Sequence, residues 1–392
     1  MDLSELREQI DSIDAEILRL FERRMDIVQN VAEYKRTNQL PVFQSGREQE
    51  IITRIGETAA PLYGQAAQVL FTAMMDISKC LQKDRLTSPQ AFLENFCADS
   101  FDTFPSGRVL VACPGTDGSF SHIAAQQLFP EGTFHFYTDF PDVFRAVENG
   151  DADFGVLPIE NSNAGSVLTV YDQLSRSPLY ICRGTKIKIE HCLAARPGVS
   201  FEEIEQVYSH PQAISQCYDF LHEHQLKPCE YSNTAAAASM VSQSMKPLAA
   251  ICSETGARQH GLSVLRRGIQ NNDQNYTRFI CVSKHVYTGA DADTTSVSFR
   301  LPNTAGSLYR MLTKVAARGI NMTKIESSPA HTEHFDVIFY VNFAGNLTQE
   351  NILCLLNDLA GEISEFKFLG NYLEVLSCGS QPGLPEVSLP GA

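Results

Sequence analysis

The chain has 392 residues, more than one ordinary domain of about 150 residues contains, so two or three domains are expected. Its net charge of −15 argues against a surface that binds nucleic acid or an anionic membrane. No apolar run reaches the roughly 18 residues of a membrane span, and the acidic N-terminus lacks the apolar segment of a signal peptide. The 11 cysteines form no C-x-x-C pair, which favours reduced thiols in the cytoplasm over a disulfide framework or a zinc site.

The first part of the chain, residues 1–85, predicts an all-α domain of three helices. The first helix, over residues 1–37, has a heptad seam formed by Leu3, Leu6, Ile10, Ile13, Ile17 and Leu20. A second helix is expected after Ser45-Gly46-Arg47-Glu48, and a third over about residues 65–83. Three helices with such narrow seams do not bury themselves well alone, so a partner chain is expected.

The rest of the chain predicts two further domains. Residues 86–107 indicate a linker with one short helix. Over residues 108–284, short apolar strands alternate with helices, which predicts a two-lobed α/β domain. Residues 295–377 follow the order β-α-β-β-α-β, with the last strand over 366–375, which is typical of a ferredoxin-like α+β domain. Residues 379–392 are rich in Pro and Gly and predict a disordered tail.

One basic residue interrupts the seam of the first helix. The heptad places Arg24 toward the bundle interior, where a guanidinium without a partner is costly, so an anionic group is expected to meet it. Lys35 lies about three turns further on and projects from nearly the same face. On the third helix, Ser78 and Gln82 are spaced i, i+4 and share a face. The alternative interpretation is a structural ion pair for Arg24 and a solvated surface for the others.

Taken together, these residues resemble the all-helical chorismate mutases over residues 1–85. The resemblance implies sites built by two intertwined chains that hold chorismate in its reactive conformer and aim donors at developing charge. It implies chorismate-binding roles for Arg7 (from the partner chain), Arg24, Lys35, Gln44, Arg47, Glu48, Ser78 and Gln82, with Arg24, Lys35, Glu48 and Gln82 as catalytic residues. Gln44 stands where the family often has Asp, and Ser45-x-x-Glu48 also fits a capping box, so Glu48 alternatively caps the second helix.

Five motifs in the α/β block lie at strand ends. They are Gly115-Thr116-Asp117-Gly118-Ser119-Phe120-Ser121-His122, Pro158-Ile159-Glu160-Asn161-Ser162, Glu190-His191-Cys192, Ser209-His210-Pro211-Gln212 and Asn275-Tyr276-Thr277-Arg278-Phe279. A Gly- and Ser-rich loop before a helix is a natural anion site, through its free N–H groups and the helix dipole. Taken singly, the motifs fit a tight turn, a helix cap or a core histidine equally well.

Together the five motifs resemble prephenate dehydratase over residues 108–284. The implied reaction removes CO₂ and water from prephenate and yields phenylpyruvate. The resemblance makes Thr277 the catalytic residue, which donates a proton or a hydrogen bond to the departing hydroxyl. The site residues that it implies are Ser119, Ser121, Glu160, Asn161, His191, Gln212, Asn275, Thr277, Arg278 and Phe279. Asn271 stands where the family often has an acid.

The third block resembles an ACT domain, a module that senses amino acids. The resemblance rests on Asn303-Thr304-Ala305-Gly306-Ser307-Leu308-Tyr309 and on Ile325-Glu326-Ser327-Ser328-Pro329. It implies phenylalanine binding by Gly306, Ser307, Leu308, Glu326 and Ser327 between paired domains. Ser328 stands where the family has Arg, and the alternative is that this domain only dimerises.

These resemblances imply a bifunctional enzyme of phenylalanine biosynthesis that is inhibited by its end product. Its small-molecule partners would be chorismate, prephenate and the effector L-phenylalanine, and the chain would form a homodimer or a higher homo-oligomer. No cofactor and no metal are expected, since the sequence has no P-loop and no zinc-ligand spacing. Two alternatives remain open: a non-catalytic sensor, and an enzyme that prefers arogenate.

Overall fold

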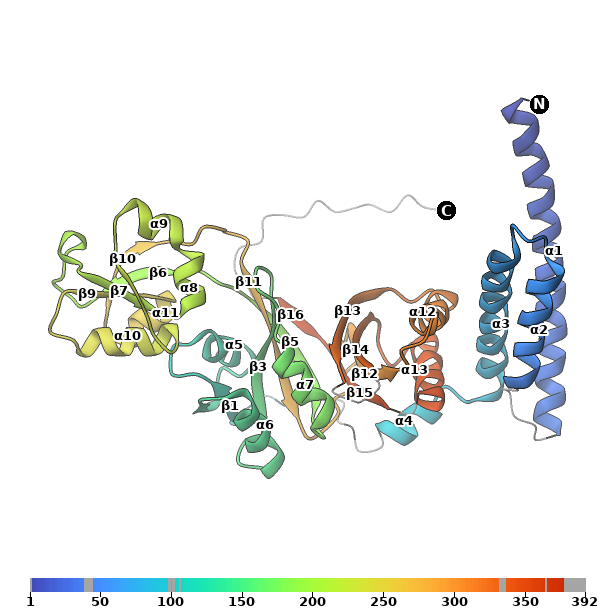
Figure 1. Cartoon of the computed structure of the whole chain (residues 1–392). Helices are drawn as coiled ribbons and strands as arrows, with labels where there is room; N and C mark the ends of the chain where they lie inside the picture. The colour runs from blue at the N-terminus through green and yellow to red at the C-terminus, as the bar shows by residue number, and fades with distance from the viewer. Residues whose placement is uncertain are drawn as a thin grey trace, which may run out of the picture. The chain divides into compact units, whose positions relative to one another are not determined.

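The computed structural model describes residues 2–38, 45–97, 100, 103–105, 107–330, 336–363 and 365–376 of the chain (Figure 1). The chain divides into two compact units. The first contains Met1–Ala98 and Val297–Lys367, and the second contains Asp99–Ser296 and Phe368–Ala392. In these described ranges, no helix is long and apolar enough to cross a membrane.

Four helices open the first unit: α1 (Leu3–Thr37), α2 (Ser45–Thr58), α3 (Gly64–Leu86) and the short α4 (Ala91–Phe96). They lie where the sequence predicts three helices and a linker helix. At the start of α1, Asp2 and Glu5 form a capping box in which the Asp2 N–H donates to Glu5 Oε2 at 3.1 Å. Both α1 and α2 contact α3.

The predicted seam of α1 is not covered within one chain. Leu3 is 59% exposed, Ile10 55% and Ile17 56%, and on α3 Leu70 is 58% exposed. The buried face of α3 carries instead a mixed set: Met75, Asp76, Ser78, Lys79, Cys80 and Gln82. Apolar stripes of this kind are unfavourable in water, and a further surface that covers them lowers the free energy.

The β-α-β-β-α-β order is present in β12 (Thr294–Leu301), α12 (Ser307–Ala317), β13 (Met322–Pro329), β14 (Val337–Ala344), α13 (Glu350–Glu362) and β15 (Phe366–Tyr372). The four strands form one sheet in the order β13-β14-β12-β15. The single last strand predicted over 366–375 is wrong. The strand breaks at Leu373, and β16 (Glu374–Leu376) pairs in parallel with β5 of another sheet.

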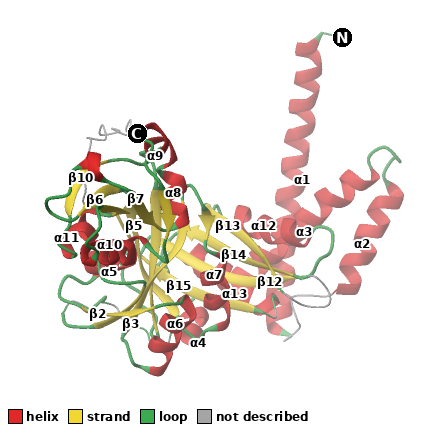
Figure 2. Cartoon of the chain, turned by 60° about the vertical axis from the view of Figure 1, so that its left-hand side comes forward, coloured by secondary structure: helices red, strands yellow, loops and turns green. Residues whose placement is uncertain are grey.

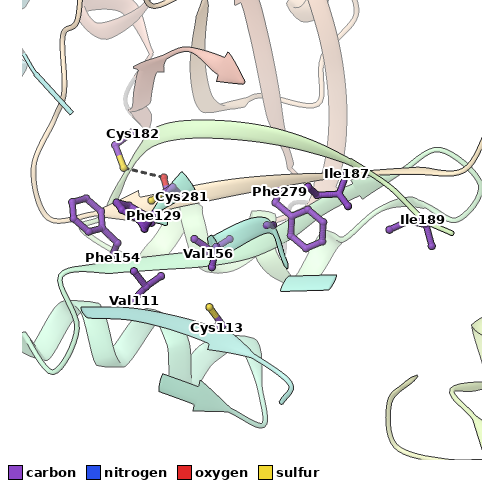
Figure 3. Close-up of a cluster of buried hydrophobic side chains, with 12 residues drawn as sticks. Val111, Cys113, Phe129, Phe154, Val156, Cys182, Ile187, Ile189, Phe279 and Cys281 are labelled. Atoms are coloured by element: carbon purple, nitrogen blue, oxygen red, sulfur yellow. Dashed lines mark hydrogen bonds between the residues drawn. The ribbon is translucent and has the colours of Figure 1, made fainter. Parts of the chain in front are cut away.

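The first lobe of the second unit is built on a seven-stranded sheet, in the order β16-β5-β11-β3-β1-β2 with β4 against β3. Its own strands are β1 (Leu110–Pro114), β2 (Thr133–Tyr137), β3 (Phe154–Asn161), β4 (Gly165–Ser166), β5 (Tyr180–Lys188) and β11 (Tyr276–Ser283). The helices are α5 (Phe120–Leu128), α6 (Phe140–Asn149) and α7 (Leu168–Arg176). Figure 3 shows apolar side chains of this lobe's core, among them Val111, Phe154, Val156 and Phe279.

The second lobe has a five-stranded sheet in the order β10-β6-β9-β7-β8. Its elements are β6 (Cys192–Ala195), the 3₁₀ turn η1 (Phe201–Glu203), β7 (Gln206–Ser209), α8 (Pro211–Gln216), α9 (Tyr218–Glu223), β8 (Pro228–Glu230), α10 (Thr234–Gln243), β9 (Leu248–Cys252), α11 (Glu254–Gln259) and β10 (Ser263–Arg267). Figure 2 labels its strands β10, β6 and β7 in yellow, with the red helices α8, α9, α10 and α11 around them. The helical stretch from Pro211 to Glu223 is interrupted at Cys217, whose φ of −114° and ψ of 20° leave the α region. The chain crosses between the lobes after β5 and before β11, which confirms the two-lobed α/β architecture.

In the second unit, the backbone at Gly370 lies so close to the backbone at Ile181 that a side chain at position 370 should destabilise the fold. Gly370 has a φ of +150°, and a Cβ built there would lie 2.1 Å from the carbonyl oxygen of Ile181. We expect Gly370→Ala to lower the free energy of unfolding by about 2–4 kcal/mol, measured by urea or thermal unfolding. Gly361→Ala is the matched control, because Gly361 lies in α13 with no atom within 4 Å of its added Cβ. Equal unfolding midpoints for Gly370→Ala and wild type would contradict the assigned contact.

Candidate active site

Two strands that carry predicted site residues lie side by side. Strand β11 runs antiparallel to β3, and their register places Thr277 opposite Asn161. Since side chains alternate along a strand, Thr277 and Phe279 point to one face of the sheet and Arg278 to the other. Thr277 and Phe279 line a cavity, together with Asn161.

Asn161 holds the Thr277 hydroxyl in a defined orientation. Its Oδ1 accepts from the backbone N–H groups of Asn163 at 3.0 Å and Ala164 at 2.9 Å. This fixes the amide so that Nδ2 donates to Thr277 Oγ1 at 2.8 Å and to Asn275 Oδ1 at 2.9 Å. Since Thr277 Oγ1 is the acceptor in this bond, its own proton remains available for donation into the cavity.

The hydrogen bonds continue into the second lobe. Asn275 Nδ2 donates to Gln216 Oε1 at 3.1 Å, and His191 Nε2 lies 2.9 Å from the same oxygen. Because Gln216 Oε1 can only accept, the contact assigns the proton to Nε2 of His191. Asn275 and His191 are 1% and 2% exposed. A buried chain of side-chain hydrogen bonds therefore joins β11 to α8.

The cavity has a volume of about 460 Å³ and is lined by residues of both lobes. Among the described residues that line it, none is Lys, Arg, Asp or Glu, and the polar groups are those of Ser121, Asn161, Ser166, His191, His210, Gln212, Gln216, Asn233, Thr234 and Thr277. The N-terminal ends of helices α5, α6, α7, α8 and α10 contribute to its walls. Free backbone N–H groups and the positive ends of helix dipoles favour an anion at such a place.

Some of the predicted site residues line this cavity, and the others lie behind it or on the opposite face of the sheet. Ser121, Asn161, His191, Gln212, Thr277 and Phe279 line the cavity. Asn275 lies one hydrogen bond behind it, and Ser119 caps α5 by accepting from the His122 N–H at 3.3 Å. Glu160 and Arg278 do not line the cavity. Arg278 Nη1 donates to Glu160 Oε2 at 3.0 Å, and its Nε donates to Glu374 Oε1 at 2.7 Å.

Sequence reasoning missed two residues that organise this site. Gln216 receives hydrogen bonds from both Asn275 and His191, and it lies four residues after Gln212 on the same helix. That i, i+4 spacing is the signal that could have found it. Asn271, noted only as a departure, supports α8 and α9. Its N–H donates to the Gln216 carbonyl oxygen at 2.7 Å, and its Oδ1 accepts from the Asp219 N–H at 3.3 Å.

In the helical region, one cluster of predicted residues comes together. The Arg24 guanidinium donates to the hydroxyl of Ser78 and lies 3.5 Å from the Met74 carbonyl oxygen. Burial lowers the pKa of Arg24. Gln82 follows Ser78 by one turn and is 8% exposed, and its Oε1 has no hydrogen-bond partner among the described residues. An unpaired buried acceptor is costly, so a donor from a ligand or from another chain would lower the free energy here.

The other predicted residues of this region are not gathered in one chain. Glu48 accepts from Lys79 Nζ at 3.1 Å, and Lys79 also lies 2.7 Å from Asp76, so this partner of Glu48 was missed by sequence reasoning. Lys35 is half-buried on α1, while Arg7 and Arg47 are exposed, and Arg47 Nη1 donates to Glu50 at 3.3 Å. Gln44 lies outside the described residues.

The predicted effector residues lie around the start of α12 and along β13. Gly306 has a φ of +85° and precedes the first residue of α12, where Thr304 Oγ1 lies 2.7 Å from Ser307 Oγ. Leu308 and Glu326 are half-buried, and Ser327 is exposed. Ser328, which replaces the expected Arg, is only 3% exposed.

Comparison with known proteins gives two family matches. Residues 111–286 match the prephenate dehydratase model, and residues 6–83 match the model of chorismate mutase type II. The bifunctional chorismate mutase/prephenate dehydratase of Aquifex aeolicus is 32% identical over 385 residues, which cover 96% of this chain and 99% of the relative.

Two solved structures resemble the chain over about two thirds of its length. Prephenate dehydratase from Arthrobacter aurescens, in complex with L-Phe, is 32% identical with a TM-score of 0.63 and covers 68% of this chain and 90% of its own. A protein described as a novel type of quorum quenching acylase is 29% identical, also with a TM-score of 0.63, and covers 67% of this chain and 97% of its own.

The buried chain of hydrogen bonds predicts the protonation of one histidine. Burial lowers the pKa of His191. The hydrogen bond to Gln216 raises this pKa, but its effect is smaller than that of burial. The unfolded chain therefore takes up a proton near pH 6.5, before the folded one does, so the contribution to stability is present above that pH and is lost as the pH falls below it. An NMR titration, assigned with His191→Gln, should show a ring midpoint below 6.5. A midpoint at or above about 6.5 would contradict this placement.

Proposed function

The chain belongs to the family of bifunctional chorismate mutase/prephenate dehydratases, and we propose that the cavity between the two lobes is its dehydratase site. The enzyme rearranges chorismate to prephenate and then removes CO₂ and water to give phenylpyruvate, two steps of phenylalanine biosynthesis. The observation that carries the assignment of the site is the Thr277 hydroxyl. It is fixed by Asn161 and presents its proton to a cavity lined largely by helix N-termini and uncharged polar groups.

The proposed chemistry follows from the direction of this hydrogen bond. As the bond from the ring carbon to the hydroxyl breaks, Thr277 Oγ–H donates its proton to the departing oxygen, which leaves as water. The electron pair of the bond to the carboxylate completes the aromatic ring, and CO₂ leaves. Negative charge grows on Thr277 Oγ1 during this step, and Asn161 Nδ2, which already donates to that oxygen at 2.8 Å, stabilises it. A proton from solvent then restores the Thr277 hydroxyl.

The absence of Lys and Arg from the described lining of the cavity supports the same reaction. Prephenate carries two carboxylates, and one of them becomes neutral CO₂. A guanidinium fork on that carboxylate would stabilise the substrate more than the transition state and would raise the barrier. Helix N-termini and neutral donors attract the anion with smaller partial charges, so less of this stabilisation is lost as the carboxylate departs.

For the mutase reaction we infer a site shared between two copies of the chain. The exposed seam of α1 supports a second chain at this surface, as does Gln82 Oε1, which has no hydrogen-bond partner among the residues that the structure describes. That chain would bring its Arg7 toward Arg24 and Ser78. Arg24 and Arg47 would hold the carboxylates, and Lys35 and Gln82 would meet the ether oxygen, where charge develops.

We further infer that the four-stranded domain at the C-terminal end is an ACT domain that binds L-phenylalanine. Its order of elements and the left-handed Gly306 at the start of α12 support this role. The complex of the Arthrobacter dehydratase with L-Phe supports the identity of the effector. Ser328 is buried on β13, so the contact that an Arg makes at this position in the family has to come from elsewhere or is lost.

The two activities should separate by mutation. With chorismate and prephenate supplied in separate assays, Thr277→Ala should lower the dehydratase rate by at least about 100-fold and leave the mutase rate unchanged. Thr277→Ser is the control, because it keeps the hydroxyl. Arg24→Ala should lower the mutase rate by at least about 100-fold and spare the dehydratase.

Three outcomes would contradict these assignments. Loss of both activities in either variant would indicate misfolding or one coupled site. An unchanged mutase rate in Arg24→Ala would exclude the proposed role of Arg24. If the wild type makes prephenate from chorismate but consumes none, the second unit is a binding module, as the sensor alternative holds. A faster rate with arogenate than with prephenate would favour the other alternative.

Effector binding can be tested at the two ends of one helix. Calorimetry with L-phenylalanine should show binding to the wild type, and the same ligand should inhibit its dehydratase activity. Gly306→Ala, before α12, should weaken binding, while Gly319→Ala, after its end, should not. Both glycines have positive φ and open space around an added Cβ, so the backbone strain is matched at about 1–2 kcal/mol. Neither heat nor inhibition in the wild type would contradict an effector site.

A further inference from the structure

An ionic cluster lies on the face of the seven-stranded sheet that is turned away from the cavity. At its centre is Arg278, whose side chain is 32% exposed. Its Nη1 donates to Glu160 Oε2 at 3.0 Å, and its Nε donates to Glu374 Oε1 at 2.7 Å. The guanidinium thus connects two carboxylates that lie far apart in the chain. Such charge-assisted contacts fix the plane of a guanidinium.

Glu374 reaches Arg278 from two strands away. The sheet order is β16-β5-β11-β3, so its side chain has to pass over β5. It lies in register with Gly184 of β5. A Cβ on Gly184 would lie 3.5 Å from Cγ of Glu374 and 3.3 Å from Cε2 of Tyr372. The missing side chain at Gly184 therefore leaves the space through which Glu374 extends.

On this face, Glu160 and Arg278 bind each other, and each of them is next in sequence to a residue that lines the cavity. Glu160 precedes Asn161 on β3, and Arg278 follows Thr277 on β11. Just beyond Arg278 the ladder is irregular: Arg278 pairs with Glu160, but Phe279 pairs with Pro158. A bulge bends its strand and disrupts the local ladder, so backbone pairing alone specifies the geometry less tightly here.

We propose that Glu374 is a positioning residue of the dehydratase site, which it controls through Arg278. By holding one side of the guanidinium while Glu160 holds the other, it fixes β11 against β3 at the bulge. This keeps Asn161 Nδ2 and Thr277 Oγ1 at hydrogen-bonding distance on the opposite face. The inference rests on the proposed function of the cavity and adds a residue from outside the five motifs.

The test is steady-state kinetics of the full chain with prephenate. Glu374→Gln keeps the shape and removes the charge, so it should lower kcat by about tenfold with KM changed less than about twofold. The matched control is Asp291→Asn, because Asp291 accepts from Arg183 of β5 at 2.9 Å and does not line the cavity. Its kcat should stay within about twofold of wild type. In an Arg278→Lys background, Glu374→Gln should have little further effect, since it acts through the guanidinium.

Several results would overturn the inference. They are an unchanged kcat in Glu374→Gln, an equal loss in Asp291→Asn, or the same fold-loss with and without Arg278→Lys. If thermal unfolding shows that Glu374→Gln is not folded, Glu374→Asp replaces it. This variant keeps the charge, but its side chain is one methylene shorter. A wild-type kcat in Glu374→Asp would then exclude the contact with Arg278. If the wild-type protein has no dehydratase activity, the proposed function itself is refuted. The comparison among variants tests only the role of Glu374.

Discussion

The hydrogen bond from Asn161 Nδ2 to Thr277 Oγ1 determines what the cavity can do. Its direction makes the threonine oxygen an acceptor and leaves the hydroxyl proton available for donation into the cavity. That direction depends in turn on two backbone N–H groups, of Asn163 and Ala164, which fix the Asn161 amide. The same amide binds Asn275, which binds Gln216 of the second lobe. The contact between the lobes and the orientation of the proposed proton donor are therefore parts of one hydrogen-bonded chain, and its buried members leave few alternative arrangements.

The sequence was sufficient to find the members of this chain that lie in motifs at strand ends. Asn161, His191, Asn275 and Thr277 lie in such motifs, and because β11 runs antiparallel to β3, the start of β11 lies beside the end of β3. The alternation of β11 also indicates that Arg278 faces away from Thr277, although a role beside the substrate was expected for it. The long helices were predictable for a related reason, because their apolar period is local and repeated.

What could not be read from the sequence depends on pairing between distant segments. Glu374 belongs to a run that continues the last strand without a break in its pattern, and only its pairing with β5 shows that it joins another sheet. Lys79 looks like an ordinary surface lysine until α2 places Glu48 beside it. In both cases the residue type is unremarkable, and the information lies in the tertiary partner. Gln216 is intermediate, since its spacing from Gln212 is a local signal but its two bonds are not.

The two proposed sites handle the same molecule with opposite electrostatics. Prephenate is the product of one reaction and the substrate of the other, and it carries two carboxylates. The mutase rearrangement keeps both carboxylates, so the proposed cations Arg24, Lys35 and Arg47 can bind them throughout without raising the barrier. The dehydratase reaction destroys one carboxylate, and its cavity is lined by neutral donors and helix N-termini. Because a pocket of cations that suits the rearrangement would hold the carboxylate that must leave as CO₂, separate pockets suit the two proposed reactions better than one shared pocket.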